Sequence, residues 1–228
     1  MQKGKLIVLD GTDGSGKATQ TKILVQQLKK TGKKVQTIDF PQYEKNFFGK
    51  MLGECLIGKY GNWVEIDPHI ASVLYAADRW ESSLKIKKWL EDGFCVIADR
   101  YVSSNQIHQG GKILKKTQRQ EFLAWLDQME FKILKIPRPD LVLYLDVPLE
   151  FSQKLMAQTK NLGKKKYQKG QTDLHENNIQ HLLNAKKSAL KLVQEKNNWV
   201  RIDCVKDHQL LSIEEINSLI WQAVEKII

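Results

Sequence analysis

Cysteine is scarce in this chain of 228 residues, and its three copies, Cys55, Cys95 and Cys204, lie far apart without a Cys-x-x-Cys spacing. An odd number of separated cysteines argues against a disulfide framework or a zinc site and is typical of reduced thiols. Long hydrophobic runs are also missing, since the apolar stretch near the N-terminus covers only residues 6–9. It is too short for a signal peptide or a membrane span, so we expect a cytoplasmic protein without a membrane partner.

Flexible linkers, internal repeats and low-complexity tracts are missing as well. Hydrophobic residues make up 42% of the sequence and charged residues 27%, a balance that argues against intrinsic disorder and fibrous repeats. A chain of this length can fill one good core but is too short for two full-sized domains. We therefore expect a single domain over residues 1–228.

The chain is basic, with a net charge of +10. A basic protein can bind nucleic acid, but these lysines are spread over groups at residues 29–34, 85–88 and 112–116, without the interleaved aromatic rings of a stacking platform. Most of them are expected on solvated helix faces, so we predict no nucleic-acid partner. A functional interpretation that does not require nucleic-acid binding is a positive field that attracts anionic nucleotides.

Short apolar runs alternate with longer segments of helical period. The run at residues 141–145 is almost wholly apolar, which is typical of a parallel strand covered on both faces. This alternation predicts an α/β fold of three layers, in which a mostly parallel five-stranded sheet binds ligands at the carboxyl ends of its strands. The expected strands cover residues 5–9, 35–38, 94–98, 141–145 and 200–202, and the expected helices cover residues 17–30, 68–91, 116–130, 149–158, 174–196 and 213–228.

Three glycines follow directly on the first expected strand and precede Lys17. Such a loop turns its backbone N–H groups toward a polyphosphate, the lysine adds a point charge, and the helix that begins there adds its positive end. The sequence therefore predicts a P-loop and the P-loop NTPase version of the three-layer fold. The residues expected to bind ATP are Gly11, Thr12, Asp13, Gly14, Ser15, Gly16, Lys17, Ala18 and Thr19.

Ala18 departs from the common motif, which has a Ser or Thr whose hydroxyl binds Mg²⁺ at this position. The chain is therefore either a nucleotide binder without turnover or a kinase that holds the metal through water. The run Gly16-Lys17-Ala18-Thr19-Gln20 resembles the Gly-Lys-Gly-Thr-Gln of adenylate kinases, which also lack that hydroxyl and are active. This resemblance favours the second interpretation.

Asp99, Arg100 and Tyr101 follow directly on the expected strand at residues 94–98. We expect their side chains at the carboxyl edge of the sheet, beside the P-loop. An arginine there can clamp a phosphate through two hydrogen bonds, and a carboxylate can hold metal-bound water. The residues that follow, up to Gly111, are polar but include no acidic residue, which suits the wall of an anion site.

A basic segment at residues 159–172 interrupts the alternation between two expected helices. Gly163 and Gly170 bracket it. Its composition fits both a short basic lid over the site and an ordinary surface loop, and the residues alone leave the two open. The lysines of this segment are Lys164, Lys165, Lys166 and Lys169.

In four separated blocks the sequence resembles the thymidylate kinase family. The order and spacing of these blocks are specific, and the likeness runs from about residue 5 to residue 205. The resemblance implies a P-loop nucleoside monophosphate kinase that transfers the γ-phosphate of MgATP to dTMP, giving dTDP and ADP. The blocks are the P-loop with Asp10, the run Phe40-Pro41-Gln42-Tyr43, the run Leu74-Tyr75-Ala76-Ala77-Asp78-Arg79, and Asp99-Arg100-Tyr101 with Ser104 and Asn105.

The resemblance also implies roles for individual side chains. Tyr75 would stack on thymine, Arg79 would bond a base carbonyl, and Asn105 would read the base edge. Mg²⁺ would be held at Asp99 through water, and the family suggests a homodimer. The implied catalytic set is Lys17, Arg100, Asp99 and Asp13, and the implied dTMP site is Asp13, Phe40, Tyr43, Tyr75, Arg79, Arg100, Ser104, Asn105 and His108.

Two features of the family are missing. His108 occupies a position where some members have a tyrosine that crowds the sugar, which leaves the selection for deoxyribose open. The catalytic arginine of the family is absent from the P-loop and from the basic segment, so we expect at least one lid lysine to replace it. A kinase of another pyrimidine monophosphate and a regulatory nucleotide-binding module without turnover remain alternatives.

Overall fold

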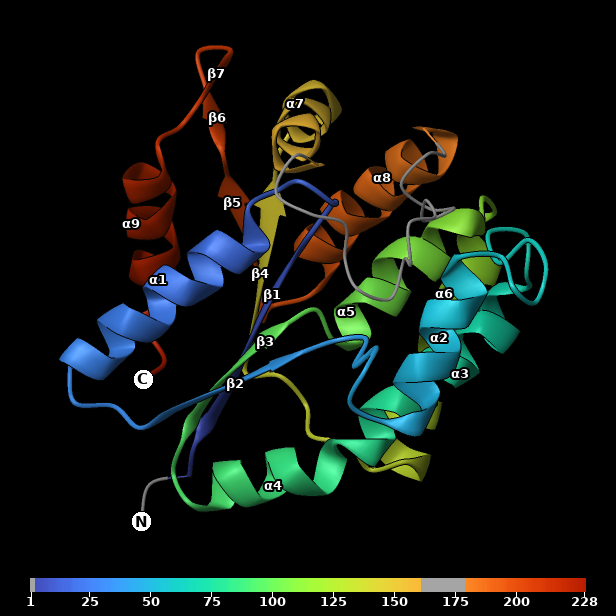
Figure 1. The fold of residues 1–228 in the computed structure, drawn as a ribbon, viewed down its shortest axis with the longest axis horizontal. Helices are drawn as coiled ribbons and strands as arrows, with labels where there is room; N and C mark the ends of the chain where they lie inside the picture. The colour runs from blue at the N-terminus through green and yellow to red at the C-terminus, as the bar shows by residue number, and fades with distance from the viewer. Residues whose placement is uncertain (1–2, 161–178) are drawn as a thin grey trace.

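The computed structural model describes residues 3–160 and 179–228, and its centre is a sheet of five parallel strands (Figure 1). The strand order is β2-β3-β1-β4-β5, so consecutive strands are joined by crossovers that contain helices. The α/β fold predicted from the alternation is confirmed. The strands are β1 (Lys5–Gly11), β2 (Val35–Asp39), β3 (Cys95–Asp99), β4 (Leu141–Asp146) and β5 (Trp199–Asp203).

Two hydrophobic cores cover the two faces of this sheet and give the fold its three layers. Successive side chains of β1 point to opposite faces, so Leu6 and Val8 pack into one core and Ile7 and Leu9 into the other. β4 is buried along its whole length, which explains its apolar sequence. The covering helices are α1 (Lys17–Lys30) and α9 (Ile213–Val224) on one face, and α4 (Ser83–Glu91), α6 (Lys116–Asp127) and α8 (Ile179–Glu195) on the other.

The helix expected over residues 68–91 is in fact two helices, α3 (Pro68–Glu81) and α4, with Ser82 between them. The two halves pack on different partners, since α3 lies against α2 (Phe47–Leu56) and α4 lies against β3 (Figure 1). The apolar period continues through both helices, so the sequence pattern did not show the break. The helix α2 was not expected at all.

Two π-helical turns lie where a regular helix or a loop was expected. The first, η1 (Asn105–Gln109), follows the short helix α5 (Val102–Ser104), and the second, η3 (Gln128–Ile133), continues α6. A π-turn moves side chains out of the rows of a regular α-helix and often occurs at functional sites. Both turns supply side chains to the candidate site.

A small hairpin of β6 (Val205–Lys206) and β7 (Gln209–Leu210) precedes α9 and was not expected either. Its turn residues, Asp207 and His208, have φ angles of 48° and 59°, the left-handed pair of a type I′ turn. Asp-His lacks the glycine that usually marks such a turn, so no local pattern predicted the hairpin.

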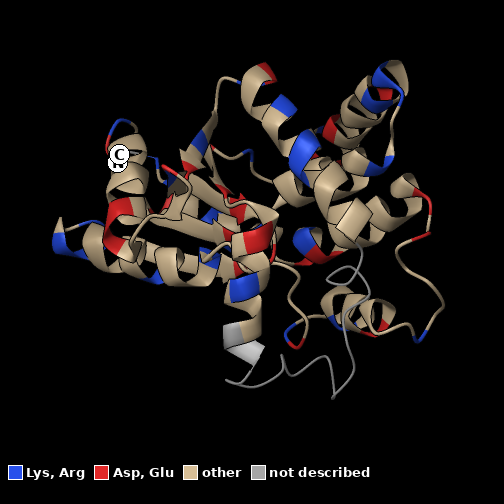
Figure 2. Ribbon diagram, turned by 90° about the horizontal axis from the view of Figure 1, so that it is seen from above, with Lys and Arg blue, Asp and Glu red and all other residues tan. Residues whose placement is uncertain are grey.

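The expected helix at residues 149–158 is α7 (Leu149–Lys160), and α8 is described from Ile179 onward. Acidic and basic residues lie side by side over the ribbon, as the view from above shows (Figure 2). This mixture fits solvated helix faces. Within residues 3–160 and 179–228, no helix is long and apolar enough to cross a membrane.

Every strand of the main sheet carries an aspartate at or next to its carboxyl end. The register places Asp39 beside Asp99 and Asp146 beside Asp203, while Asp10 lies on the central strand β1. Like charges this close repel one another, unless cations or hydrogen-bond donors face them. The candidate site is built from the groups that meet this acidic edge.

Candidate functional site

The predicted P-loop joins β1 to α1 and turns through glycines in the left-handed region. Gly14 has a φ of 78°, and a Cβ there would lie 2.3 Å from the carbonyl oxygen of Ser152 on α7. Both the conformation and the space therefore exclude a side chain at Gly14. Gly16 is the N-cap residue of α1, so the N–H groups of the first helical turn are available beside the loop.

Lys17 crosses this loop from the first turn of α1. Its Nζ donates to the carbonyl oxygens of Gly11 at 3.0 Å and Thr12 at 2.9 Å, and the side chain is buried. Burial lowers the pKa of Lys17 to about 8; the Arg100 charge adds to this shift, and nearby carboxylates oppose it. The loop therefore holds a desolvated cation where the sequence predicted a phosphate ligand.

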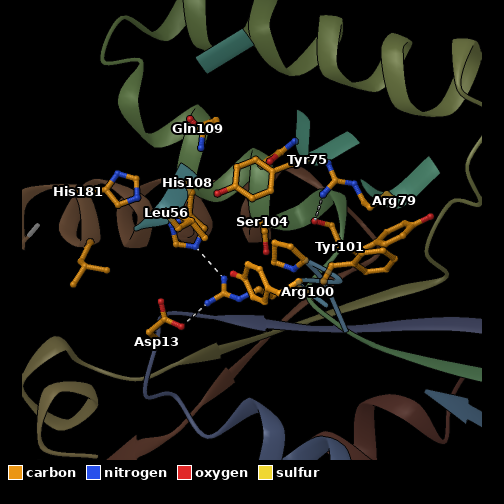
Figure 3. A pocket seen from close by; sticks show the side chains of 15 residues that line it. Asp13, Leu56, Tyr75, Arg79, Arg100, Tyr101, Ser104, His108, Gln109 and His181 are labelled. Atoms are coloured by element: carbon orange, nitrogen blue, oxygen red, sulfur yellow. Dashed lines mark hydrogen bonds and ion pairs between the residues drawn. The ribbon is translucent and has the colours of Figure 1, made fainter. Parts of the chain in front are cut away.

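Arg100 joins the P-loop to the neighbouring pocket (Figure 3). One guanidinium nitrogen donates to Oδ1 of Asp13 at 2.8 Å, and the other lies 3.2 Å from Nε2 of His108 and 3.7 Å from Oδ1 of Asp10. Burial lowers the pKa of Arg100, but the carboxylates of Asp13, Asp10 and Asp99 raise it above its ordinary value. Its φ of 66° is uncommon for a residue with a side chain, and backbone strain of this kind clusters at functional sites.

A cavity beside Arg100 brings together the nine side chains expected at the dTMP site. It encloses about 690 Å³ of space, part of it open to solvent, which suits a nucleotide-sized ligand. Tyr75 and Arg100 both reach into it (Figure 3). The sequence missed the other lining residues, which are Pro41, Leu56, Tyr101, Gln109, His181 and Leu182. His181 and Leu182 come from α8, and no local pattern marked them.

Arg79 lies deeper in this wall than expected, because its guanidinium is paired with Glu130 of η3. Nε donates to Oε2 at 2.7 Å and a terminal nitrogen donates to Oε1 at 2.5 Å. Burial raises the pKa of Glu130, and the Arg79 guanidinium opposes this shift. The two residues are 51 positions apart in the chain, so no local sequence signal pointed to Glu130.

Asp10 is fully buried and organises the segment after β3. Its Oδ2 accepts from the hydroxyls of Ser103 at 2.6 Å and Ser104 at 2.8 Å, and its Oδ1 accepts from the N–H of Gly11 at 2.8 Å. The hydroxyl of Ser104, expected at the nucleotide, is therefore bonded to Asp10, although Ser104 also lines the cavity. This carboxylate ties the P-loop to the pocket wall.

Asp78 holds the loop that carries Tyr43 and was not recognised as a site residue. Its carboxylate accepts from the N–H of Gln42 at 3.3 Å and from Nδ2 of Asn46 at 2.7 Å. Burial raises the pKa of Asp78 to about 6, and the hydrogen bond from Asn46 opposes the shift. The loop after β2 is thus fixed against α3.

Asp99 is the group that could hold a metal ion, and its surroundings fit an ion bound through water. It lines a second cavity with Ala18 and Asp39 at the end of β2. Burial raises the pKa of Asp99, and the Lys17 and Arg100 charges oppose the shift. In the part of the chain that the structure describes, no three acidic, histidine or cysteine side chains gather as a metal site. Ala18 adds no oxygen, so water would complete the coordination.

The lid prediction falls mostly on residues 161–178, which lie outside the described residues. Lys164, Lys165, Lys166 and Lys169 all belong to that range. Their replacement of the missing arginine therefore stays a prediction.

Asp78 is expected to give the folded protein a distinct pH dependence. Its pKa is about 6 in the folded state against 3.8 ordinarily, so the folded state binds more protons between these values. The free energy of unfolding should therefore fall as pH rises from 4 to 6, by up to about 3 kcal/mol. In Asp78→Asn this contribution disappears, as urea unfolding across the pH range would show.

The control is Asp92→Asn, which changes an exposed carboxylate at the end of α4. It should leave the pH profile of the parent unchanged. Parallel profiles for the parent and Asp78→Asn would show that Asp78 does not titrate in this range.

Comparison with known proteins agrees with this geometry. The thymidylate kinase family model matches residues 9–216. Human thymidylate kinase is 32% identical over 170 residues, 74% of this chain and 71% of the human protein. The Plasmodium falciparum enzyme is 31% identical over 229 residues, 99% of this chain and 92% of its own. The solved structure of Candida albicans thymidylate kinase superposes with a TM-score of 0.74 at 25% identity, covering 98% of this chain and 92% of that one. This chain belongs to the thymidylate kinase family.

Proposed function

We propose that the chain works as one kinase domain that transfers the γ-phosphate of ATP to dTMP, giving ADP and dTDP. The observation that supports this most is the place of Arg100. Its guanidinium contacts Asp13 of the P-loop on one side and His108 of the cavity wall on the other. A phosphate bound by Arg100 would lie between the donor loop and the acceptor pocket, where an in-line transfer requires it.

On the donor side, the P-loop amides and Lys17 hold the β- and γ-phosphates of ATP. Nζ of Lys17 is bonded to two neutral carbonyl oxygens in the structure, those of Gly11 and Thr12. Phosphate oxygens are charged and bind an ammonium group more strongly, so Lys17 exchanges partners when ATP binds. Lys17 then neutralises charge on the transferring phosphoryl group, and Ala18 and Thr19 lie beside it on the first turn of α1.

On the acceptor side, Arg100 clamps the phosphate of dTMP with its planar fork. In the structure, the guanidinium of Arg100 contacts Asp13 and His108, and an incoming phosphate competes with both side chains. Asp13 then accepts from the 3′-hydroxyl of the sugar. Phe40 and Tyr43 also line the cavity and exclude water from the reacting phosphates.

At the far end of the cavity, Tyr75 stacks on thymine. Arg79 donates to a base carbonyl, and Asn105 binds the base edge. One aromatic ring and two edge contacts suit a base of one ring. His108 lies beside the sugar position, so it decides how strictly ribose is rejected.

ATP-dependent members of this family generally act with a divalent metal, and we propose Mg²⁺ held at Asp99 through water. The ion supplies positive charge that offsets the charge of the phosphates. Asp99 is placed for this by β3, and the charges of Lys17 and Arg100 oppose the rise that burial causes in the pKa of its carboxyl group.

The second candidate function is a kinase that phosphorylates several nucleoside monophosphates. The Candida albicans relative is described as having broad substrate specificity, and this chain has His108 at the sugar position. A regulatory module that only binds a nucleotide does not need a second pocket. Here the wall of the second pocket is bonded to the P-loop through Asp10. The pocket therefore supports a kinase over a regulatory binder.

The cysteines support a reducing, cytoplasmic setting for this reaction. Cys55, Cys95 and Cys204 are all free and buried in the structure. Burial raises the pKa of each thiol, which keeps it protonated and unreactive.

Steady-state kinetics with a panel of monophosphates should identify dTMP as the preferred acceptor. We expect its kcat/KM to exceed those of dAMP, dGMP and CMP by at least about tenfold, because one stacking ring and two edge contacts suit a single-ring base, and cytosine presents an amino group to the donor Arg79. If a purine gave the highest value, the base-binding assignment would be wrong and the kinase assignment would stand. If no monophosphate were phosphorylated, the kinase assignment itself would fail.

Lys17 should give the ATP dependence a characteristic pH profile. The free enzyme loses the Lys17 proton near pH 8, whereas bound phosphates raise this pKa again. We therefore expect kcat/KM for ATP to fall above pH 8 while kcat stays level to higher pH, since kcat/KM reports the free enzyme.

Lys17→Ala is a second test of the role assigned to Lys17. It should remain folded by circular dichroism and lose nearly all turnover. A level kcat/KM from pH 7 to 9.5 in the parent, or near-parental kcat in Lys17→Ala, would contradict the assignment of Lys17.

The helix pair α2 and α3 exposes an apolar face that supports the homodimer we propose. Ile70, Val73 and Trp80 share one side of α3 and are 62%, 48% and 51% exposed, and Phe47 and Met51 of α2 are 70% and 37% exposed. Glu81 accepts from the N–H of Phe48, so the two helices present these side chains together. An exposed apolar patch of this kind is typical of an interface, and a second copy of the chain provides a matching surface.

Light scattering after gel filtration should give the parent twice the chain mass of 26.3 kDa. Trp80→Glu places a charge in this apolar face and should give the mass of the single chain. The matched control is Ile213→Glu, because Ile213 is 48% exposed and begins α9, which lies across the sheet from α3 (Figure 1). A parent of single-chain mass would contradict the homodimer.

A further inference from the structure

We infer that Glu130 is a positioning residue for base selection, because its carboxylate fixes the orientation of Arg79 and Asn105 in the cavity wall. The inference rests on the proposed function and names what makes the site select thymine over cytosine. Glu130 is buried and is not among the residues that line the cavity. Glu130 therefore acts through Arg79 and Asn105, which both line the cavity.

Both oxygens of Glu130 are used to hold Arg79. They accept from Nε and from one terminal nitrogen at 2.7 Å and 2.5 Å, the two-fold pairing that fixes the plane of a guanidinium. Arg79 is 2% exposed and Glu130 is 0% exposed, so water does not compete for these contacts. The remaining nitrogen donates to the carbonyl oxygen of Tyr101 at 3.3 Å and carries a second N–H (Figure 3). Arg79 thus has a donor left for a ligand.

Asn105 is held through its amide nitrogen. Nδ2 donates to the carbonyl oxygen of Ser72 at 3.3 Å and lies 3.5 Å from Oε1 of Glu130. Both neighbours are acceptors, so the nitrogen of the amide is turned toward them. Among the described residues, none donates to Oδ1 of Asn105, and Asn105 lines the cavity. The polar group that Asn105 offers a ligand is therefore an acceptor.

A donor at Arg79 and an acceptor at Asn105 match thymine and oppose cytosine. Thymine has an acceptor at O4 and an N–H at N3, whereas cytosine has an amino group at C4 and an unprotonated N3. Cytosine would place donor against donor at Arg79 and acceptor against acceptor at Asn105. Unpaired polar groups in a closed site are costly, which is how such a site rejects the wrong base.

A carboxylate side chain at residue 130 is needed to keep a donor at Arg79 and an acceptor at Asn105. A glutamine has one acceptor oxygen, so it does not accept from both nitrogens of Arg79 in the same way. Its N–H₂ group can also donate to Oδ1 of Asn105 once that amide rotates, a new contact that replaces the hydrogen bond from Nδ2 to the carbonyl oxygen of Ser72. The rotated amide would turn Nδ2 to the cavity, the arrangement that suits N3 of cytosine.

The test is the ratio of kcat/KM for dTMP to kcat/KM for dCMP, measured at saturating ATP for the parent, Glu130→Gln and Glu130→Asp. For Glu130→Gln we expect the ratio to fall by about tenfold to a hundredfold through a higher KM for dTMP. The kcat for dTMP should stay within about threefold of the parent, because base contacts contribute to binding before and during the reaction alike. Glu130→Asp keeps the charge but withdraws it from Asn105, so a smaller fall is expected.

Glu195→Gln is the matched control, since Glu195 lies 3.7 Å from another buried arginine, Arg119, away from the cavity. It should leave the ratio unchanged. The inference is overturned if both Glu130 variants keep the parental ratio, whatever their melting temperatures, or if Glu195→Gln lowers it equally. Should Glu130→Gln not fold, Glu130→Asp decides by the same criterion. A parent that does not prefer dTMP to dCMP would instead overturn the proposed base reading, and the inference with it.

Discussion

The acidic carboxyl edge of the sheet is the constraint on which the rest of the site depends. Parallel strands bring their ends together, and here each end carries an aspartate. Such a row is stable only when cations or donors face it. Lys186 and Arg201 pair with Asp146, and Lys45 pairs with Asp39. The groups that face the centre of the row are Lys17 and Arg100, the two side chains that we propose bind the phosphates.

In the structure, the two cations of the site are bonded to protein oxygens instead of substrate phosphates. Lys17 is bonded to carbonyl oxygens of the P-loop, and Arg100 is bonded to Asp13. In the mechanism that we propose, each partner holds the cation next to its substrate phosphate, so little rearrangement would be needed when the substrates bind. Preorganised charge of this kind is the main source of catalysis in phosphoryl transfer, where the protein forms no covalent bond.

Buried polar contacts also hold the wall of the pocket together. Arg79 and Asn105 of this wall lie on α3 and η1, and the buried pair of Arg79 and Glu130 joins α3 to η3. Breaking one partner of such a pair leaves a buried charge, which is far more costly than the pair itself is stabilising. Asp10 joins α5, which leads into η1, to the P-loop through Ser103 and Ser104. Donor and acceptor sites are therefore parts of one framework.

Local periodicity and the glycines next to a lysine were enough to predict the strand and helix alternation, the P-loop and the position of Arg100 after β3. The membership of Tyr75 and Asn105 in one pocket came from the resemblance. The break at Ser82, the place of His181 in the cavity wall and the pairing of Arg79 with Glu130 became known from the folded chain alone. Each of these depends on which distant segments meet, and buried charges choose their partners by the packing of the whole chain, which no local pattern records.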